Sequence, residues 1–161
     1  MSFRNLSLIA AALVVAGVAG TASAATDTKN FNVTMTITGA CDISTGTATN
    51  VAFGSAAAGG TDKTATGNLI VNCSNGQAYA ITLNNGGNYA AGRRMRLGAT
   101  TNYIAYDLYS DAGFSTAWTS VAGTGNGLDQ NIPVYGKVLA ANYATSVPGA
   151  YTDTVTATVT Y

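Results

Sequence analysis

The two cysteines, Cys41 and Cys73, are the side chains of this sequence best suited to covalent chemistry. A redox or nucleophilic role would favour a Cys-x-x-Cys motif or a histidine partner, and the sequence contains neither. Residues 1–24 indicate an exported chain, and an even pair of cysteines in such a chain predicts one structural disulfide. It would close a loop of about 33 residues, for which the chain-entropy model gives roughly 3.7 kcal/mol of stabilisation.

The sequence has few side chains suited to acid–base catalysis or to metal binding. The sequence has no His and no Glu, and its seven acidic residues are all Asp and are scattered. Gly54-Ser55-Ala56-Ala57 lacks the final glycine of a nucleophile elbow, and Gly136-Lys137 lacks the rest of a phosphate-binding loop. No calcium-loop pattern or Cys/His cluster is present. We therefore predict no enzyme activity, no catalytic residues, no metal and no cofactor.

Two further groups of side chains could bind a ligand. The only cluster of charge consists of Arg93, Arg94 and Arg96. It could hold a small anion, but we favour a solvated loop or a strand edge that positive charge protects from aggregation. Four aromatic residues could line a carbohydrate site: Tyr103, Tyr106, Tyr109 and Trp118. Aromatic residues at strand spacing more often belong to a core or a sheet surface, which we favour here.

Residues 1–24 have the pattern of a secretory signal peptide. Arg4 supplies the positive charge, residues 8–19 form an apolar run, and Ala22-Ser23-Ala24 fits the cleavage site. Cleavage after Ala24, or alternatively after Ala25, leaves about 137 residues, which suits one domain. The apolar run is too short to span a bilayer, so we expect export without membrane insertion.

The remaining composition favours strands. Removing Arg4 from the seven Lys and Arg leaves six against seven Asp, a net charge of about −1 that argues against nucleic acid as a partner. The sequence has 24 Thr and 19 Gly but no Glu, so β-branched and turn residues are abundant while good helix formers are scarce. We predict an all-β fold.

Two segments alternate apolar and polar residues, as a strand with two different faces does. One face of residues 151–161 carries Val155, Ala157, Val159 and Tyr161, opposite four threonines. One face of residues 31–38 carries Phe31, Val33, Met35 and Ile37. No turn or partner strand follows residues 151–161 in this sequence, so we expect their partner to come from elsewhere. Strong strands at both ends favour a protein that pairs strands, within one copy or between copies.

Further strands are expected between these two segments. The expected ranges are 40–53 (weakly), 68–73, 78–83, 103–109 and 132–139. The Asn75-Gly76 turn signal predicts a hairpin between 68–73 and 78–83, and residues 123–127 read as a glycine-rich loop. Seven or eight short strands separated by such turns predict a sandwich or a barrel.

The order of short motifs along the chain resembles that of a known family. The motifs are Val51-Ala52-Phe53-Gly54 after Cys41, then residues 69–73 and 79–83, Arg94-Met95 before residues 104–111 and Trp118, and finally residues 148–155. Together they resemble the spore coat protein U-like domain family, and within it the pilin subunits of archaic chaperone–usher pili. The resemblance covers nearly all of the mature chain.

This resemblance implies an incomplete immunoglobulin-like β-sandwich that lacks its final strand. A periplasmic chaperone would fill the resulting groove, and at an outer-membrane usher the next subunit's N-terminal segment would replace it. It implies residues 25–39 as the donor segment, with Phe31, Val33, Met35 and Ile37 as inserting side chains. Residues 40–161 would form the pilin domain, with Val155, Ala157, Val159 and Tyr161 at the acceptor groove and chaperone contact. The subunit would reach the cell surface and support adhesion and biofilm formation.

Two alternatives stay open from the sequence. In the first, a secreted coat protein folds its N-terminal strand back into its own groove, although only Gly39 and Ala40 separate that strand from Cys41. In the second, the sandwich is a carbohydrate-binding module. A tip adhesin usually carries an additional receptor domain, for which about 137 residues leave no room.

Overall fold

The computed structural model describes residues 23–43 and 47–161. Most of the expected signal peptide lies outside these residues, so the signal peptide stays a prediction. Among the described residues, no helix is long and apolar enough to cross a bilayer. The chain divides into a unit that ends at Thr36 and a unit from Ile37 to Tyr161. Residues 40–161 are called the body below.

The described part of the first unit, with the residues that follow up to Gly39, is called the arm. No residue of the arm lies in a helix or strand, and all are exposed. The four apolar side chains of the expected strand are 79–86% exposed: Phe31, Val33, Met35 and Ile37. The prediction of a formed strand over residues 31–38 is therefore wrong for the chain alone, because a strand needs a second strand to pair its backbone groups.

The described residues of the body form ten strands and one short 3₁₀ helix. They are β1 (Cys41–Asp42), β2 (Lys63–Cys73), β3 (Ala78–Leu83), β4 (Arg94–Leu97), β5 (Tyr103–Ala105), β6 (Asp107–Tyr109), β7 (Val121–Thr124), β8 (Asp129–Val138), η1 (Ala140–Asn142), β9 (Tyr151–Thr152) and β10 (Ala157–Thr160). The strands form three antiparallel sheets, in the orders β1-β2-β8-β6, β10-β3-β7 and β5-β4-β9. The predicted all-β class is confirmed.

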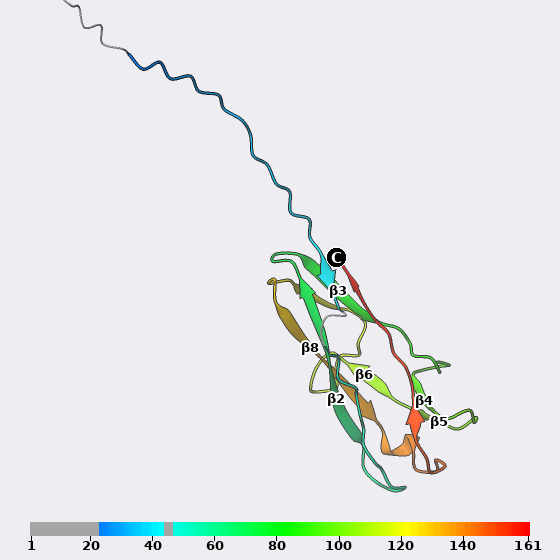
Figure 1. Cartoon of the computed structure of the whole chain (residues 1–161). Helices are drawn as coiled ribbons and strands as arrows, with labels where there is room; N and C mark the ends of the chain where they lie inside the picture. The colour runs from blue at the N-terminus through cyan, green and yellow to red at the C-terminus, as the bar shows by residue number, and fades with distance from the viewer. Residues whose placement is uncertain (1–22, 44–46) are drawn as a thin grey trace, which may run out of the picture. The chain divides into compact units, whose positions relative to one another are not determined.

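The longest ladder joins β2 to β8, the long pair of arrows in Figure 1. It runs over ten residue pairs, from Lys63 opposite Val138 to Asn72 opposite Asp129. The inner face of β2 contributes Val71, which packs in one buried cluster with Ile81 of β3. This burial follows the period-two alternation of both strands.

The expected hairpin between residues 68–73 and 78–83 is wrong. The turn itself forms, with the Gln77 N–H donating to the Ser74 carbonyl at 2.9 Å and Gly76 at a φ of 81°. However, β2 already has β1 and β8 on its two edges, and β3 lies between β10 and β7. Since neither strand has a free edge for the other, the turn carries the chain from one sheet to another.

Three other expected elements differ from the structure. Residues 103–109 form two strands, because β5 pairs with β4 whereas β6 pairs with β8. In the expected loop 123–127, Gly123 belongs to β7, where a β-carbon would clash with the ring of Tyr79. Of residues 40–53, the described strand structure is β1 and an isolated bridge between Thr49 and Asn68.

Candidate functional site

An apolar groove lies between residues 48–58 and residues 147–157. It consists of two cavities of about 730 and 620 Å³. Both are lined by Val51, Phe53, Met95 and Tyr151, so they form one continuous groove. Further apolar lining comes from strands of all three sheets: Leu69, Leu83, Ile104, Leu108, Val134 and Val138.

The first wall of the groove, residues 48–58, is fixed to β2 by few contacts. The Thr49 N–H donates to the Asn68 carbonyl at 2.9 Å, and the Asn68 N–H donates back at 3.1 Å. Val51 and Phe53 lie over Gly136 of β8, where a β-carbon would clash with Val51 and lie 2.8 Å from Phe53 Cζ. The absence of a side chain at Gly136 therefore lets the wall approach the sheet closely.

The second wall is the C-terminal segment, which bonds to its inner neighbours through alternate residues. The Asn84 N–H donates to the Thr156 carbonyl at 2.9 Å, and the Gly87 N–H donates to the Thr154 carbonyl at 3.1 Å. In an extended strand, the backbone groups of successive residues point to opposite edges. The N–H and C=O groups of Val155, Ala157 and Val159 therefore face the other edge, and among the described strands β10 pairs with β3 alone.

A polar contact in the second cavity explains why the terminal segment is two strands rather than one. Asp153 Oδ1 accepts hydrogen bonds from the backbone N–H and the side-chain amide of Asn88, at 3.2 and 3.0 Å. Asp153 Oδ2 accepts one from the Tyr106 hydroxyl at 2.7 Å. Burial, followed by this hydrogen bond, raises the pKa of Tyr106. At Gly86, whose φ is 86°, a β-carbon would clash with the Asp153 carboxylate, so loop 84–88 lies directly against the terminal segment.

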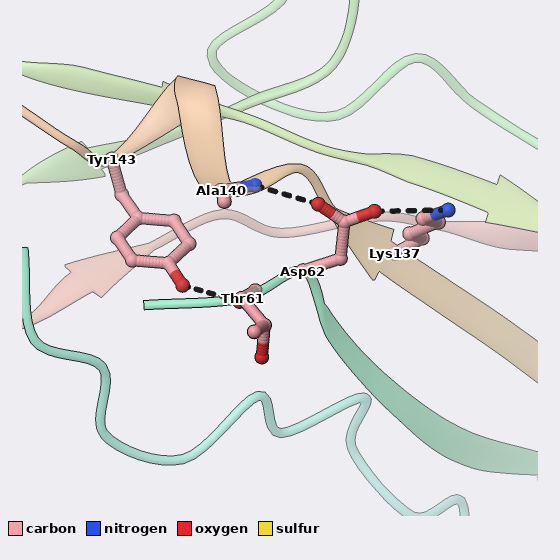
Figure 2. A network of polar contacts seen from close by, with 5 residues as sticks. All are labelled: Thr61, Asp62, Lys137, Ala140 and Tyr143. Atoms are coloured by element: carbon pink, nitrogen blue, oxygen red, sulfur yellow. Dashed lines mark hydrogen bonds and ion pairs between the residues drawn. The ribbon is translucent and has the colours of Figure 1, made fainter. Parts of the chain in front are cut away.

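A second polar network, drawn in Figure 2, reaches the first cavity through Tyr143. The hydroxyl of Tyr143, which lines that cavity, donates to the Thr61 carbonyl. Asp62 accepts a 2.9 Å hydrogen bond from the Ala140 N–H and pairs with Lys137 at 3.1 Å. The hydrogen bond from Ala140, and then Lys137, lower the pKa of Asp62. This network ties the start of β2 to η1 and the end of β8.

The predicted site residues fall into different places. Cys41 and Cys73 form the expected disulfide, which joins β1 to β2. Val155 and Ala157 line the second cavity. Val159 packs against the core but lines neither cavity, and Tyr161 is 59% exposed beyond β10.

Most of the groove lining was missed from the sequence. The wall at residues 48–58 alternates only weakly in hydrophobicity, and Met95 and Tyr151 lie on four-residue and two-residue strands. Gly136, which lies opposite Val51 and Phe53, was a possible signal of this wall. It can be recognised as one only when the register of β8 is known.

The arginine cluster is not a protected strand edge. Arg94 and Arg96 lie on β4, the central strand of its sheet. The guanidinium of Arg94 lies 4.0 Å from the centre of the Tyr103 ring, and its Nε donates to the Asn88 carbonyl at 2.9 Å. These contacts pack Arg94 against a residue of β5 and against the loop that precedes β4, so the prediction of a protected strand edge is wrong.

The aromatic residues do not form one open site. Tyr106 and Trp118 belong to the buried core, as favoured from the sequence, while Tyr103 and Tyr109 are half-buried on strands of two different sheets. Within the described residues, no group of three or more Asp, Glu, His or Cys side chains could hold a metal ion.

Comparison with known proteins identifies the family. Residues 27–158 match the family model of the Spore Coat Protein U domain. The chain belongs to this family. Protein U of Myxococcus xanthus is 38% identical to it, over 87% of this chain and 88% of that protein. The resemblance drawn from the sequence motifs is confirmed.

A solved structure also resembles this Spore Coat Protein U domain. It is the crystal structure of the CsuC–CsuE chaperone–tip adhesion subunit pre-assembly complex from archaic chaperone–usher Csu pili of Acinetobacter baumannii. The match has a TM-score of 0.56 and 22% identity over 78% of this chain, which spans 40% of the matched chain. At this identity the likeness shows the fold, and the immunoglobulin-like sandwich is confirmed.

Proposed function

We propose that this chain is a structural subunit of a bacterial surface pilus assembled by the chaperone–usher route. Copies would join head to tail when the arm of one copy enters the groove of the next. The observation that carries this proposal is the apolar groove beside an edge of β10 that no described strand pairs. An arm with four exposed apolar side chains at strand spacing is a suitable occupant.

The groove and the arm offer matching chemistry. Backbone groups of Val155, Ala157 and Val159 could form a ladder with an added strand, at roughly 0.5–1.5 kcal/mol per hydrogen bond. Burying Phe31, Val33, Met35 and Ile37 would add roughly 1.5–3 kcal/mol each, about 6–12 kcal/mol before ordering costs. A joint of this size could hold a fibre together without a covalent link.

Assembly by this route would need two further partners. A periplasmic chaperone would occupy the groove before polymerisation, and an outer-membrane usher would exchange it for the next arm. The subunit would pass through the periplasm to the cell surface, where the fibre would support adhesion and biofilm formation. The likeness to a chaperone–subunit complex and the signal-like residues 1–24 support this assignment.

Insertion into a second copy is favoured over insertion into the same copy. Ala40 already continues the β1 ladder, since its N–H donates to Ser74 Oγ at 3.1 Å and its carbonyl accepts from the Ser74 N–H at 2.8 Å. Only Thr38 and Gly39 would then be left to reverse the direction of the chain between an inserted arm and Ala40, which is a very short connection. Protein purified from cells without the chaperone tests the choice, because a stable monomer would support self-insertion and slow fibres would support exchange.

Deletion of residues 26–38 tests the proposed function. The shortened subunit should still reach the periplasm, because its signal and body are intact, but surface fibres should be lost. Immunoblots of periplasmic extracts and electron microscopy of whole cells would measure the two effects. Normal fibres from this deletion would refute the proposal.

A further inference from the structure

We propose that the Cys41–Cys73 disulfide keeps tension on the arm away from the groove of the same subunit. This inference rests on the proposed function, because a head-to-tail fibre would pull each subunit through its arm. The order of segments along the chain motivates it. The arm leads into β1, then into the groove wall that carries Val51 and Phe53, and only then into β2.

The backbone pairing of this region is short, although Val51 and Phe53 also pack against the core. Ala40 is held by its two hydrogen bonds to Ser74, and β1 pairs with β2 over two residue pairs. Backbone hydrogen bonds contribute roughly 0.5–1.5 kcal/mol each, and a ladder pulled from its end opens one bond at a time. Beyond β1, the described backbone contact of the wall is the pair of hydrogen bonds between Thr49 and Asn68.

Without the disulfide, tension that opened β1 would therefore reach the groove wall next. Val51 and Phe53 would be drawn off Gly136, and the groove would lose one side while it holds the arm of the neighbouring subunit. Tension would then release the neighbour from a subunit whose core is still folded.

The disulfide changes the path of the force. Its bond connects Cys41 directly to Cys73, so force from the arm passes into β2 without crossing residues 42–72. Cys73 is fully buried, and β2 pairs with β8 over ten residue pairs. The wall at residues 48–58 lies inside the closed loop, so force from the subunit's own arm does not pass along its backbone.

A two-tether force experiment on the mature chain tests this inference. One tether is attached to the arm, and the other to a synthetic peptide of residues 26–38 seated in the groove. At equal force, the bound lifetime of the peptide should be roughly tenfold shorter in a Cys41→Ala/Cys73→Ala variant than in the wild-type chain. This is about the effect of losing the two hydrogen bonds between Thr49 and Asn68. Without force, its dissociation rate should differ by less than about twofold. Equal lifetimes under force would overturn the inference.

A second measurement does not depend on the peptide. The tethers are placed on the arm and on an azide side chain at Leu128, which is exposed in the loop between β7 and β8. The double variant should lengthen at low force by up to about 43–47 Å as the 13 residues 41–53 detach, at roughly 3.3–3.6 Å per residue. The wild-type chain should show no such step before global unfolding. A step in both chains, or in neither, would refute the role of the disulfide.

Two controls distinguish the effect of the disulfide from the loss of another contact and from misfolding. Ser74→Ala removes the side-chain bond to Ala40 but keeps the disulfide, so it should behave as wild type. If the double variant does not fold, wild-type chain reduced while tethered takes its place. A peptide that fails to bind the wild-type groove at zero force would count against the proposed function, and the Leu128 measurement would still decide the inference.

Discussion

The hydroxyl of Tyr106 donates a 2.7 Å hydrogen bond to Oδ2 of Asp153, across 47 residues of sequence. Tyr106 lies where the chain leaves β5 for β6, and Asp153 lies between β9 and β10. Both residues line the second cavity. This hydrogen bond connects the residue that joins β5 to β6, two strands of different sheets, to the C-terminal wall of the groove. The bond therefore helps to fix the position of this wall relative to the core.

Replacing Tyr106 by Phe should destabilise the fold by about 1.5–3 kcal/mol, because the bond has a carboxylate acceptor and is half-buried. Urea unfolding at pH 7 would measure the loss. Tyr151→Phe is the matched control, since its hydroxyl donates to the Val147 carbonyl at 2.8 Å, a neutral and exposed acceptor. It should cost about 0.5–1 kcal/mol. Equal losses from the two substitutions would show that the charge of Asp153 adds nothing.

The same hydrogen bond should make stability depend on alkaline pH. The pKa of Tyr106 is raised in the folded state above its ordinary value of 10.0, first by burial and then by Asp153. A raised pKa means that this contribution to stability is complete below pH 10 and declines as the pH rises above 10. Unfolding midpoints between pH 9 and 11 should therefore fall more steeply for wild type than for Tyr106→Phe. Parallel curves would contradict this assignment.

At acid pH, Asp62 should show the opposite dependence. Its pKa is lowered, first by the Ala140 N–H and then by Lys137, so its contribution is present above pH 3.8 and is lost as the pH falls through the lower folded value. Asp62→Asn should lower the urea midpoint at pH 7 and match wild type at pH 2. Lys137→Met, which keeps the hydrogen bond from Ala140, should have a smaller effect at pH 7. A deficit of Asp62→Asn that persists at pH 2 would rule out charge as its cause.

Local patterns predicted some strands well, but the strong alternation of residues 31–38 forms no strand in the chain alone. Residues 78–83 form β3 with the expected bounds, because Tyr79 and Ile81 alternate with small residues between clear turn signals. The Asn75-Gly76 turn was also correct, yet the expected hairpin was wrong. A turn signal reports a local reversal of the chain, whereas pairing depends on which strand edges are already occupied.

The candidate site was less predictable because it depends on contacts between distant residues. Alternation put Val155 and Ala157 on one face of a strand, and the family resemblance placed that face at the groove, where both residues line the second cavity. The break at Asp153 could not be predicted in this way, since it arises from Asn88 and Tyr106, which lie 65 and 47 residues away. Likewise, nothing in the local sequence of Gly136 states that Val51 and Phe53 lie over it.

Gly136→Ala should therefore damage the groove more than an ordinary glycine substitution. The added methyl would clash with Val51 and press on Phe53, at a cost of about 1–3 kcal/mol for overpacking. Weaker binding of the 26–38 peptide should accompany this loss, as measured by fluorescence anisotropy. Gly92→Ala is the control, because a β-carbon there meets no atom within 4 Å. Unchanged stability and binding in Gly136→Ala would mean that the wall does not depend on this close approach.

The two faces of the arm should respond differently to the same charge. In a seated strand, Val33 would point into the groove and Thr34 away from it. Val33→Asp loses the burial of an apolar side chain and places a carboxylate against Val51, Phe53 and Met95, so the peptide should bind at least about a hundredfold more weakly. Thr34→Asp should change affinity by less than about threefold, because its carboxylate stays in water. In the full chain, electron micrographs should show that Val33→Asp abolishes fibres and that Thr34→Asp keeps them. Equal effects on both faces would mean that the arm does not bind as an ordered strand, because only an ordered strand keeps one face of the arm away from the groove.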